Sequence, residues 1–267
     1  ALPILTALQA DRKDLAAFAT AISDCDDFDL VVDCIGYDPQ DAVQDIEQFR
    51  HRTKRFVFVS TDFVFDPAHR KFPQSEESDH YLADSYGGKK RQCEQIFLDS
   101  DCGTMEWTVV RPCHIYGPGS LLGCLPTHGR DRDLIDRMRK EEPLKLVGGG
   151  HFLQQPILAG DLADLMLSLA DCEDAAGRIF QAAGPDIVES KAFYEIIADL
   201  LGVGLQVEEI PVGEYLRDHP ASAPFLCHRI YDLSRLGAVG ATVPATPLVR
   251  GRASHVESIL NKAWAFA

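Results

Sequence analysis

Two side chains that could carry chemistry lie four residues apart in the segment DSYGGKKRQCEQIF, residues 84–97: Tyr86 and Lys90. On a helix this spacing places both side chains on one face, so the ammonium of Lys90 can lie close to the phenol of Tyr86. An ammonium stabilises a phenolate and lowers the pKa of the phenol, which is ordinarily about 10. Such a phenol can exchange a proton with a reacting hydroxyl. The same spacing also arises by chance on solvated helices, so the surrounding elements must decide between the two interpretations.

Short apolar runs alternate with amphipathic segments through the first half of the chain. Nearly continuous apolar strands separated by helices indicate a parallel sheet that helices cover on both faces. The pattern predicts an α/β fold with a doubly wound, Rossmann-like sheet. The predicted strands are residues 2–8, 28–36, 55–61 and 106–112, and the predicted helices are residues 12–24, 39–50 and 84–99.

The rhythm changes beyond Pro112, where shorter elements follow a Gly/Pro-rich loop. These indicate a smaller α+β part at the carboxyl edge of the sheet, where such folds bind ligands. Its predicted helices are residues 132–142, 161–171 and 190–202, and its predicted strands are residues 178–184 and 205–212. We predict a dinucleotide-binding domain over residues 1–118 and a mostly small substrate-binding part over 119–267, of which about 157–183 returns to the main sheet.

Composition narrows the class of protein. The 267 residues are 46% hydrophobic, which is typical of a globular chain with a core, and the formal net charge of −15 argues against a nucleic-acid partner held by bulk charge. The sequence shows neither a run long enough to span a bilayer nor a signal peptide. We therefore expect a soluble, cytoplasmic protein without a membrane partner. The eight cysteines have no CxxC spacing, which favours reduced thiols over disulfides and predicts no metal site.

Three features follow one another in chain order. The segment VFVSTDFVF places Thr61 at a strand end, Tyr86 and Lys90 follow on a helix 25 residues later, and the next strand ends in VVRPCHIYGPG. Together they resemble the extended short-chain dehydrogenase/reductase superfamily, in its NAD-dependent epimerase/dehydratase branch, over nearly the whole chain. The resemblance implies NAD or NADP as cofactor. It also implies that Thr61 holds the substrate oxygen, that Tyr86 is the acid/base, and that Lys90 stabilises the phenolate and binds the nicotinamide ribose. For Thr61, a strand-end turn hydroxyl is the alternative.

Weaker matches add further residues. QADRKD resembles the strand end that meets the adenine side of the cofactor, although Asp11 could instead cap the next helix. DCIG stands where the family brings backbone close to the cofactor. The resemblance therefore implies cofactor contacts at Asp11, Arg12, Cys34, Ile35, Gly36, Tyr86, Lys90, Pro112 and His114, and substrate contacts at Asp62, His114 and Gln154. For His114, a structural role is the alternative.

The glycine-rich GxxGxxG turn that the family uses to bind the cofactor pyrophosphate is absent. The first matched element resembles the family's third strand, so the domain lacks a first strand–helix–strand unit. We expect the sequence to be a segment of a longer protein rather than a divergent form.

Other departures bear on the substrate. Gln154 stands where the family has an arginine that clamps a nucleotide-sugar diphosphate, and Gln155 replaces an acid, which argues against that substrate. STDFVFD resembles dTDP-4-dehydrorhamnose reductases, and Phe63 replaces the glutamate of dehydratases. The segments RPCHIYGPG and GGGHFLQQPI also resemble the atypical chloroplast stem-loop-binding relatives.

Two hypotheses follow. The first is an NAD(P)-dependent oxidoreductase or epimerase that acts on a sugar-like hydroxyl or keto compound. The second is a non-catalytic or regulatory protein of the same fold that binds a dinucleotide, RNA or another protein. For the first, we expect a small-molecule, sugar-like partner and no nucleic acid, with a homodimer as a possible assembly.

Overall fold

The computed structural model describes residues 6–129 and 131–265, and it confirms the predicted α/β fold. Its main sheet has four parallel strands in the order β1-β2-β3-β8: β1 (Phe28–Asp33), β2 (Thr53–Val59), β3 (Glu106–Pro112) and β8 (Arg178–Ala182). Val57 of β2 lies opposite Val32 on one side and Thr108 on the other. Because all strands are parallel, their carboxyl ends meet along one edge of the sheet.

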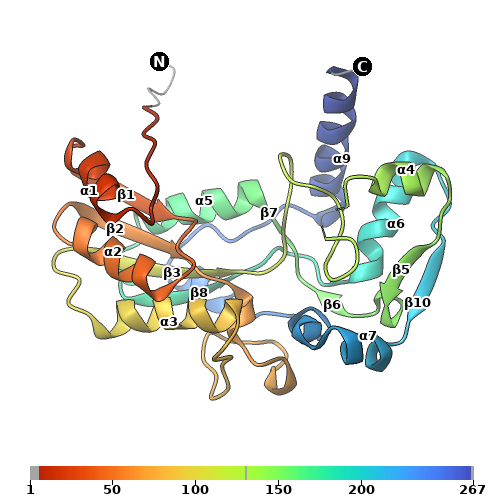
Figure 1. The fold of residues 1–267 in the computed structure, drawn as a ribbon, viewed down its shortest axis with the longest axis horizontal. Helices are drawn as coiled ribbons and strands as arrows, with labels where there is room; N and C mark the ends of the chain where they lie inside the picture. The colour runs from red at the N-terminus through yellow and green to blue at the C-terminus, as the bar shows by residue number, and fades with distance from the viewer. Residues whose placement is uncertain (1–5, 130, 266–267) are drawn as a thin grey trace.

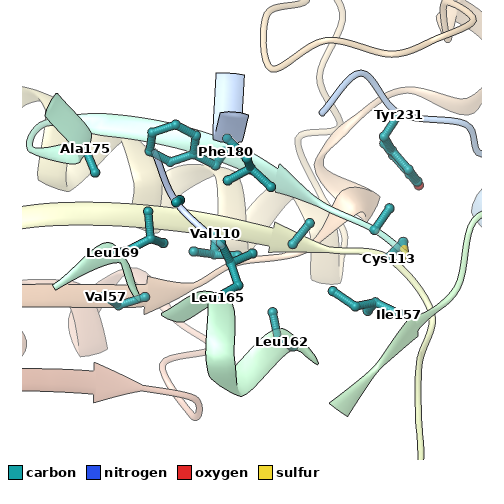
Figure 2. Close-up of a cluster of buried hydrophobic side chains, with 14 residues drawn as sticks. Val57, Val110, Cys113, Ile157, Leu162, Leu165, Leu169, Ala175, Phe180 and Tyr231 are labelled. Atoms are coloured by element: carbon teal, nitrogen blue, oxygen red, sulfur yellow. The ribbon is translucent and has the colours of Figure 1, made fainter. Parts of the chain in front are cut away.

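Helices cover both faces of this sheet (Figure 1). Helices α2 (Pro39–Phe49) and α3 (Tyr86–Asp99) pack on one face, and α5 (Ala159–Leu169) packs on the other. Successive strand residues point to opposite faces, so Phe56 and Phe58 join the first core while Val57 joins the second. Figure 2 shows this second core, in which Leu162, Leu165 and Leu169 of α5 meet Val57, Val110 and Phe180.

A smaller part with a core of its own adjoins the carboxyl edge of the sheet. Its short strands pair as β5 (Leu144–Val147) with β10 (Val207–Ile210), β4 (Ile115–Tyr116) with β7 (Ile157–Leu158), and β6 (Leu153–Gln154) with β9 (Val188–Glu189). Its helices are α4 (Leu134–Arg139), α6 (Ser190–Leu201), α7 (Val212–Asp218) and α9 (Leu248–Ala265). The short helix α8 (Ser234–Ala238) instead places Leu236 in the core between the main sheet and α5. None of the helices in the described ranges is long and apolar enough to cross a membrane.

The strand that the sequence predicts at residues 2–8 is not found in the part of this segment that the structure describes. Residues 6–8 have no strand structure, and residues 2–5 lie outside the described ranges. An extended segment becomes a strand only when a neighbour takes up its backbone hydrogen bonds, and in the described part of the chain β1 pairs with β2 alone. The next described helix, α1 (Leu15–Ser23), carries no buried residue and lies beside this edge of the sheet (Figure 1).

Candidate active site

A cavity of about 310 Å³ lies where the carboxyl ends of the strands meet the smaller part. Side chains from both parts line it, including several that the sequence patterns predicted for catalysis, cofactor or substrate. The predicted residues in its wall are Cys34, Thr61, Asp62, Tyr86, Lys90, Pro112 and His114. The structure thus brings together residues that lie up to 80 positions apart in the sequence.

The turn after β2 positions Thr61. The Thr61 hydroxyl accepts a hydrogen bond from the backbone N–H of Phe63 at 3.3 Å, which starts the short 3-10 helix Asp62–Val64. Thr61 therefore does serve as a turn hydroxyl, which was the alternative to a role in substrate binding. The two roles are compatible, because a hydroxyl that accepts one hydrogen bond can still donate its own proton to another group. The same hydroxyl lines the cavity, as Tyr86 does.

Two glycines allow close backbone packing at the first turn of α3, and Gly87 is the one that lies against the turn after β2. Helix α3 begins after Ser85, whose hydroxyl accepts a hydrogen bond from the N–H of Gly88 at 3.0 Å. A Cβ atom on Gly87 would lie 1.7 Å from the carbonyl oxygen of Phe63, and one on Gly88 would lie 2.0 Å from that of Ala83. Only residues without a Cβ fit at these positions, so the sequence YGGK fixes how closely Tyr86 approaches Thr61.

Lys90 is 1% exposed. Its ammonium donates a hydrogen bond to the carbonyl of Val59 at 2.5 Å and lies 4.6 Å from the ring centre of Phe58 and 5.0 Å from that of Tyr37. Burial lowers the pKa of Lys90, against the opposing effect of Asp33. The rings on either side attract the cation, which partly offsets the loss of hydration.

Tyr86 differs from the expectation in one respect. Burial, followed by the neighbouring Tyr37 and the Asp62 carboxylate, raises its pKa, and the Thr61 hydroxyl acts in the opposite direction. The predicted lowering by Lys90 is wrong for this structure, because the ammonium points to the Val59 carbonyl at the end of β2. Helical spacing places both residues on one face, but it does not determine where the long lysine side chain points.

The DCIG segment follows β1, and Cys34 lines the cavity. The backbone N–H groups of Ile35 and Gly36 both donate to the carboxylate of Asp33, at 2.8 and 2.9 Å. Ile35 itself is 56% exposed. The backbone that was predicted to approach a cofactor is therefore near the cavity, with these two donors already engaged within the chain.

Arg12 lies outside the cavity wall, in a buried cluster of carboxylates. Its guanidinium donates to Asp33 at 2.8 Å and to Asp45 at 2.5 Å, and it also binds the backbone carbonyl of Asp41 at 3.0 Å. Asp11 is exposed and accepts a hydrogen bond from the N–H of Lys13. The helix cap that Asp11 could have provided comes from Asp14, whose carboxylate accepts from Ala17 at 3.0 Å.

The three predicted substrate residues take different positions. His114 lines the cavity, and burial, followed by the charges of Arg252 and Arg229, holds its pKa well below the ordinary value, so the ring is neutral. Asp62 also lines it, and its carboxylate accepts a hydrogen bond from the hydroxyl of Tyr231. Gln154 is buried and lies behind the wall, where its backbone bridges to that of Arg229.

The polar wall residues that the sequence patterns missed include Tyr37 and Arg229. Tyr37 follows DCIG directly, and its ring centre lies 6.3 Å from that of Tyr86. Arg229 lies with His228 inside the largely apolar run FLCHRIY, and a charge in such a run is the signal that could have indicated it.

The chain is similar to known proteins in sequence and in fold. The sequence model described as the NAD dependent epimerase/dehydratase family matches residues 6–183. A search among curated protein sequences found no match. Among solved structures, Pal from Bacillus thuringiensis superposes with a TM-score of 0.76 at 20% identity, over 96% of this chain and 83% of that one.

Two further structures share the fold. RMD from Pseudomonas aeruginosa, complexed with NADPH, has a TM-score of 0.75 at 15% identity, over 97% of this chain and 89% of that one. UDP-glucuronic acid 4-epimerase from Bacillus cereus, in complex with NAD, has a TM-score of 0.67 at 16% identity, over 95% of this chain and 80% of that one. At these identities the likeness concerns the fold.

Proposed function

Since the chain belongs to the NAD-dependent epimerase/dehydratase family, we propose that it is an oxidoreductase or epimerase that acts on a sugar-like alcohol or ketone by hydride transfer. Family membership marks the chain as an NAD-dependent enzyme with a Rossmann-type fold. The residue roles and the substrate are our proposal. The observation that carries it is the meeting of Thr61, Tyr86 and Lys90 in one cavity at the carboxyl edge of a parallel sheet.

The described residues fit the nicotinamide end of a dinucleotide. An ammonium has three N–H donors, and the hydrogen bond to Val59 uses one of those of Lys90. The remaining donors are available to the hydroxyls of a ribose, for which Lys90 is the proposed holder. For the pyrophosphate end, Gly36 is the single glycine in the loop from β1 to α2. Its backbone N–H already donates a hydrogen bond to the carboxylate of Asp33.

Tyr86 is suited to act as a proton donor. Its raised pKa keeps the phenol protonated at neutral pH, which is the form that can protonate the oxygen of a ketone during its reduction. When bound, the nicotinamide supplies or accepts the hydride. Thr61 would hold the reacting oxygen through its hydroxyl, and in the oxidation direction Tyr86 would accept the alcohol proton.

The substrate and cofactor classes rest on the relatives and on the predicted division of the chain. One similar structure is a UDP-glucuronic acid 4-epimerase with NAD, and another holds NADPH. We therefore propose a sugar-like substrate and either NAD or NADP. Residues 1–118 would bind the dinucleotide, and residues 119–267 would supply most substrate contacts. A cytoplasmic location and a homodimer remain predictions.

A second candidate is a protein of this family that binds a ligand without turnover. It is favoured by the engaged backbone donors of Ile35 and Gly36, because a dinucleotide would have to find its pyrophosphate contacts elsewhere. The two candidates differ in whether hydride is transferred to or from a substrate. Both predict ligand binding, so one binding experiment serves both, and a turnover assay separates them.

Titration of the protein with NADH and NADPH, followed by nicotinamide fluorescence, tests the proposal directly. Adjacent lysines give a matched pair, because Lys90 is buried in the cavity wall and Lys89 is 57% exposed at its side chain, bound to Asp38 at 2.7 Å. We expect Lys90→Met to weaken binding at least about tenfold, as loss of charge-assisted hydrogen bonds does, and Lys89→Met to leave it unchanged.

Turnover is then measured with a panel of sugars and keto sugars, as a change in nicotinamide absorbance for net oxidation or reduction and as a change in the NMR spectrum of the sugar for epimerisation, which leaves the nicotinamide unchanged overall. Binding that depends on Lys90 together with turnover supports the enzyme. Binding without any turnover across the panel supports the second candidate. Absence of binding to both dinucleotides, or equal effects of the two lysine variants, contradicts the proposal.

A further inference from the structure

Arg229 is a buried cation that faces the cavity without a hydrogen-bond partner. It is 4% exposed and lines the wall, yet its guanidinium donates no hydrogen bond to any residue in the described ranges. The nearest carboxylate is that of Asp62, whose Oδ2 lies 3.6 Å from an amino group of Arg229. Removing a guanidinium from water without giving it acceptors costs several kcal/mol, so an acceptor of some kind is expected in the cavity.

Asp62 does not balance this charge. Its carboxylate already accepts from the hydroxyl of Tyr231, and its Oδ2 lies 3.4 Å from the guanidinium of Arg70, which is also buried. One carboxylate thus serves two guanidinium groups. The cavity wall adds the ammonium of Lys90, and its His114 is neutral, so an excess of positive charge lines this cavity in a chain whose net charge is −15.

The position of Arg229 is fixed by its surroundings. Its backbone N–H donates to the carbonyl of Leu153 at 2.8 Å, and its guanidinium lies 5.3 Å from the ring centre of Phe63. Phe63 belongs to the same short turn as Thr61. A guanidinium carries a planar fork of N–H donors, which can bind a carboxylate through two hydrogen bonds.

The closeness of Arg229 to the turn that holds Thr61 decides which part of a substrate Arg229 would bind. Thr61 and Phe63 are two residues apart, and both line a cavity of about 310 Å³ together with Tyr86 and Arg229. Because these side chains share one cavity wall, a single sugar-sized ring can reach Thr61, Tyr86 and Arg229 together. A group bound by Arg229 is therefore attached to the same ring that presents its hydroxyl or ketone to Thr61 and Tyr86.

We propose that Arg229 forms a subsite for a carboxylate on the reacting ring, so that the substrate is an acidic sugar or a similar hydroxy or keto acid. The inference rests on the proposed function, because it takes Thr61 and Tyr86 as the reacting side of the cavity. Arg229 becomes the residue that selects acidic over neutral substrates.

Three sugars that differ only at the sixth carbon test the assignment: glucose, glucuronate and glucose 6-phosphate. Their dissociation constants are measured by ligand-observed NMR on the whole protein, with and without saturating NADH. We expect wild type to bind glucuronate at least about tenfold more tightly than glucose. Arg229→Gln should remove that preference, and Arg229→Lys should keep part of it, since a lysine keeps the charge but not the fork.

The control is Arg217→Gln, which removes the same charge from an exposed position on α7 and should leave all three affinities unchanged. Circular dichroism and thermal unfolding establish that each variant is folded. Equal binding of glucose and glucuronate by wild type, or a preference that survives in Arg229→Gln, would overturn the proposal. Arg229-dependent binding that favours glucose 6-phosphate over glucuronate would overturn the carboxylate assignment.

These outcomes are separable from the fate of the proposed function. If NADH does not bind, the oxidoreductase proposal fails, while the preference between glucuronate and glucose, measured without NADH, still decides the role of Arg229. If NADH binds through Lys90 and no preference for glucuronate is found, the enzyme stands and the carboxylate subsite falls.

Discussion

The ammonium of Lys90 lies 5.0 Å from the ring centre of Tyr37, and the ring of Tyr37 lies 6.3 Å from that of Tyr86. Tyr37 therefore contacts both partners of the four-residue pair. Lys90 and Tyr86 do not share a direct hydrogen bond. The ring of Tyr37 lies near both, and the Lys90 ammonium donates to the backbone carbonyl of Val59. This arrangement determines how the cavity handles protons, because the pKa of Tyr86 is set by burial and by Tyr37 and not by the ammonium.

Tyr86→Phe should lower kcat by about 10²- to 10⁴-fold, the usual contribution of a positioned acid or base. The wild-type pKa is raised, so the phenol keeps its proton through neutral pH. Reduction of a ketone should therefore be independent of pH until the pH passes the ordinary tyrosine value of about 10, whereas oxidation of an alcohol should accelerate toward that range. Rates of the two directions between pH 6 and 10, measured for wild type and for Tyr86→Phe, check this. A wild-type pH profile that persists in Tyr86→Phe would exclude this role.

Gly87→Ala should destabilise the protein by about 1–3 kcal/mol, because the new methyl group would collide with the Phe63 carbonyl and force α3 away from the Thr61 turn. The same displacement should lower kcat/KM. Gly160→Ala is the matched control, since the space around Gly160 near the start of α5 is open to within 4.0 Å. Alanine favours helix over glycine, so the control should be neutral or slightly stabilising. Urea unfolding of both variants measures the difference, and equal effects would show that the close approach at Gly87 is unimportant.

Asp45→Asn should make the free energy of unfolding less dependent on pH. Three carboxylates surround Arg12, and burial, followed by the nearby Asp33, raises the pKa of Asp45 to about 9. An unfolded aspartate titrates at about 3.9, so between these values the folded state holds a proton that the unfolded state has lost. Stability should fall across this window by up to about 1.4 kcal/mol per pH unit, and the slope should end near pH 9.

The measurement is urea unfolding at several values between pH 5 and pH 9. Asparagine cannot ionise, so Asp45→Asn should flatten the curve and be more stable than wild type near pH 8. Asp26→Asn, at an exposed position, should follow the wild-type curve. An unchanged slope in Asp45→Asn would mean that this carboxyl is ionised in the folded protein.

The main sheet could be predicted from the sequence because buried parallel strands are continuous apolar runs, as in LVV and RFVFV, and the helices between them are amphipathic. The two-residue strands of the smaller part carry no periodicity, so their pairing is decided by tertiary contacts. Helix α9 was not predicted, because a mix of polar and apolar residues around Gly251 gives a weak helical signal.

At the site, the family resemblance carried by strand order and spacing implied Thr61, Tyr86 and Lys90, and all three lie in the cavity wall. The direction of the Lys90 side chain was not, since it depends on a carbonyl from another element. Arg229 reaches the cavity from more than 130 positions beyond Tyr86, and only the packing of the smaller part brings it there. The role of Arg12 was predicted from a motif position, whereas its contacts are decided by the acidic residues of α2 and β1.

The hydrogen bond between Tyr231 and Asp62 joins residues that are 169 positions apart, and the one between Arg70 and Tyr231 joins residues 161 positions apart. Contacts of such separation require most of the chain to be in place before they can form, and proteins rich in them fold slowly. The cavity is thus a late product of folding. During synthesis the ribosome releases the sheet strands β1 to β3 well before residues 229–231 emerge, so the nascent protein carries Tyr86 and Lys90 for some time before the side of the cavity that Arg229 lines exists.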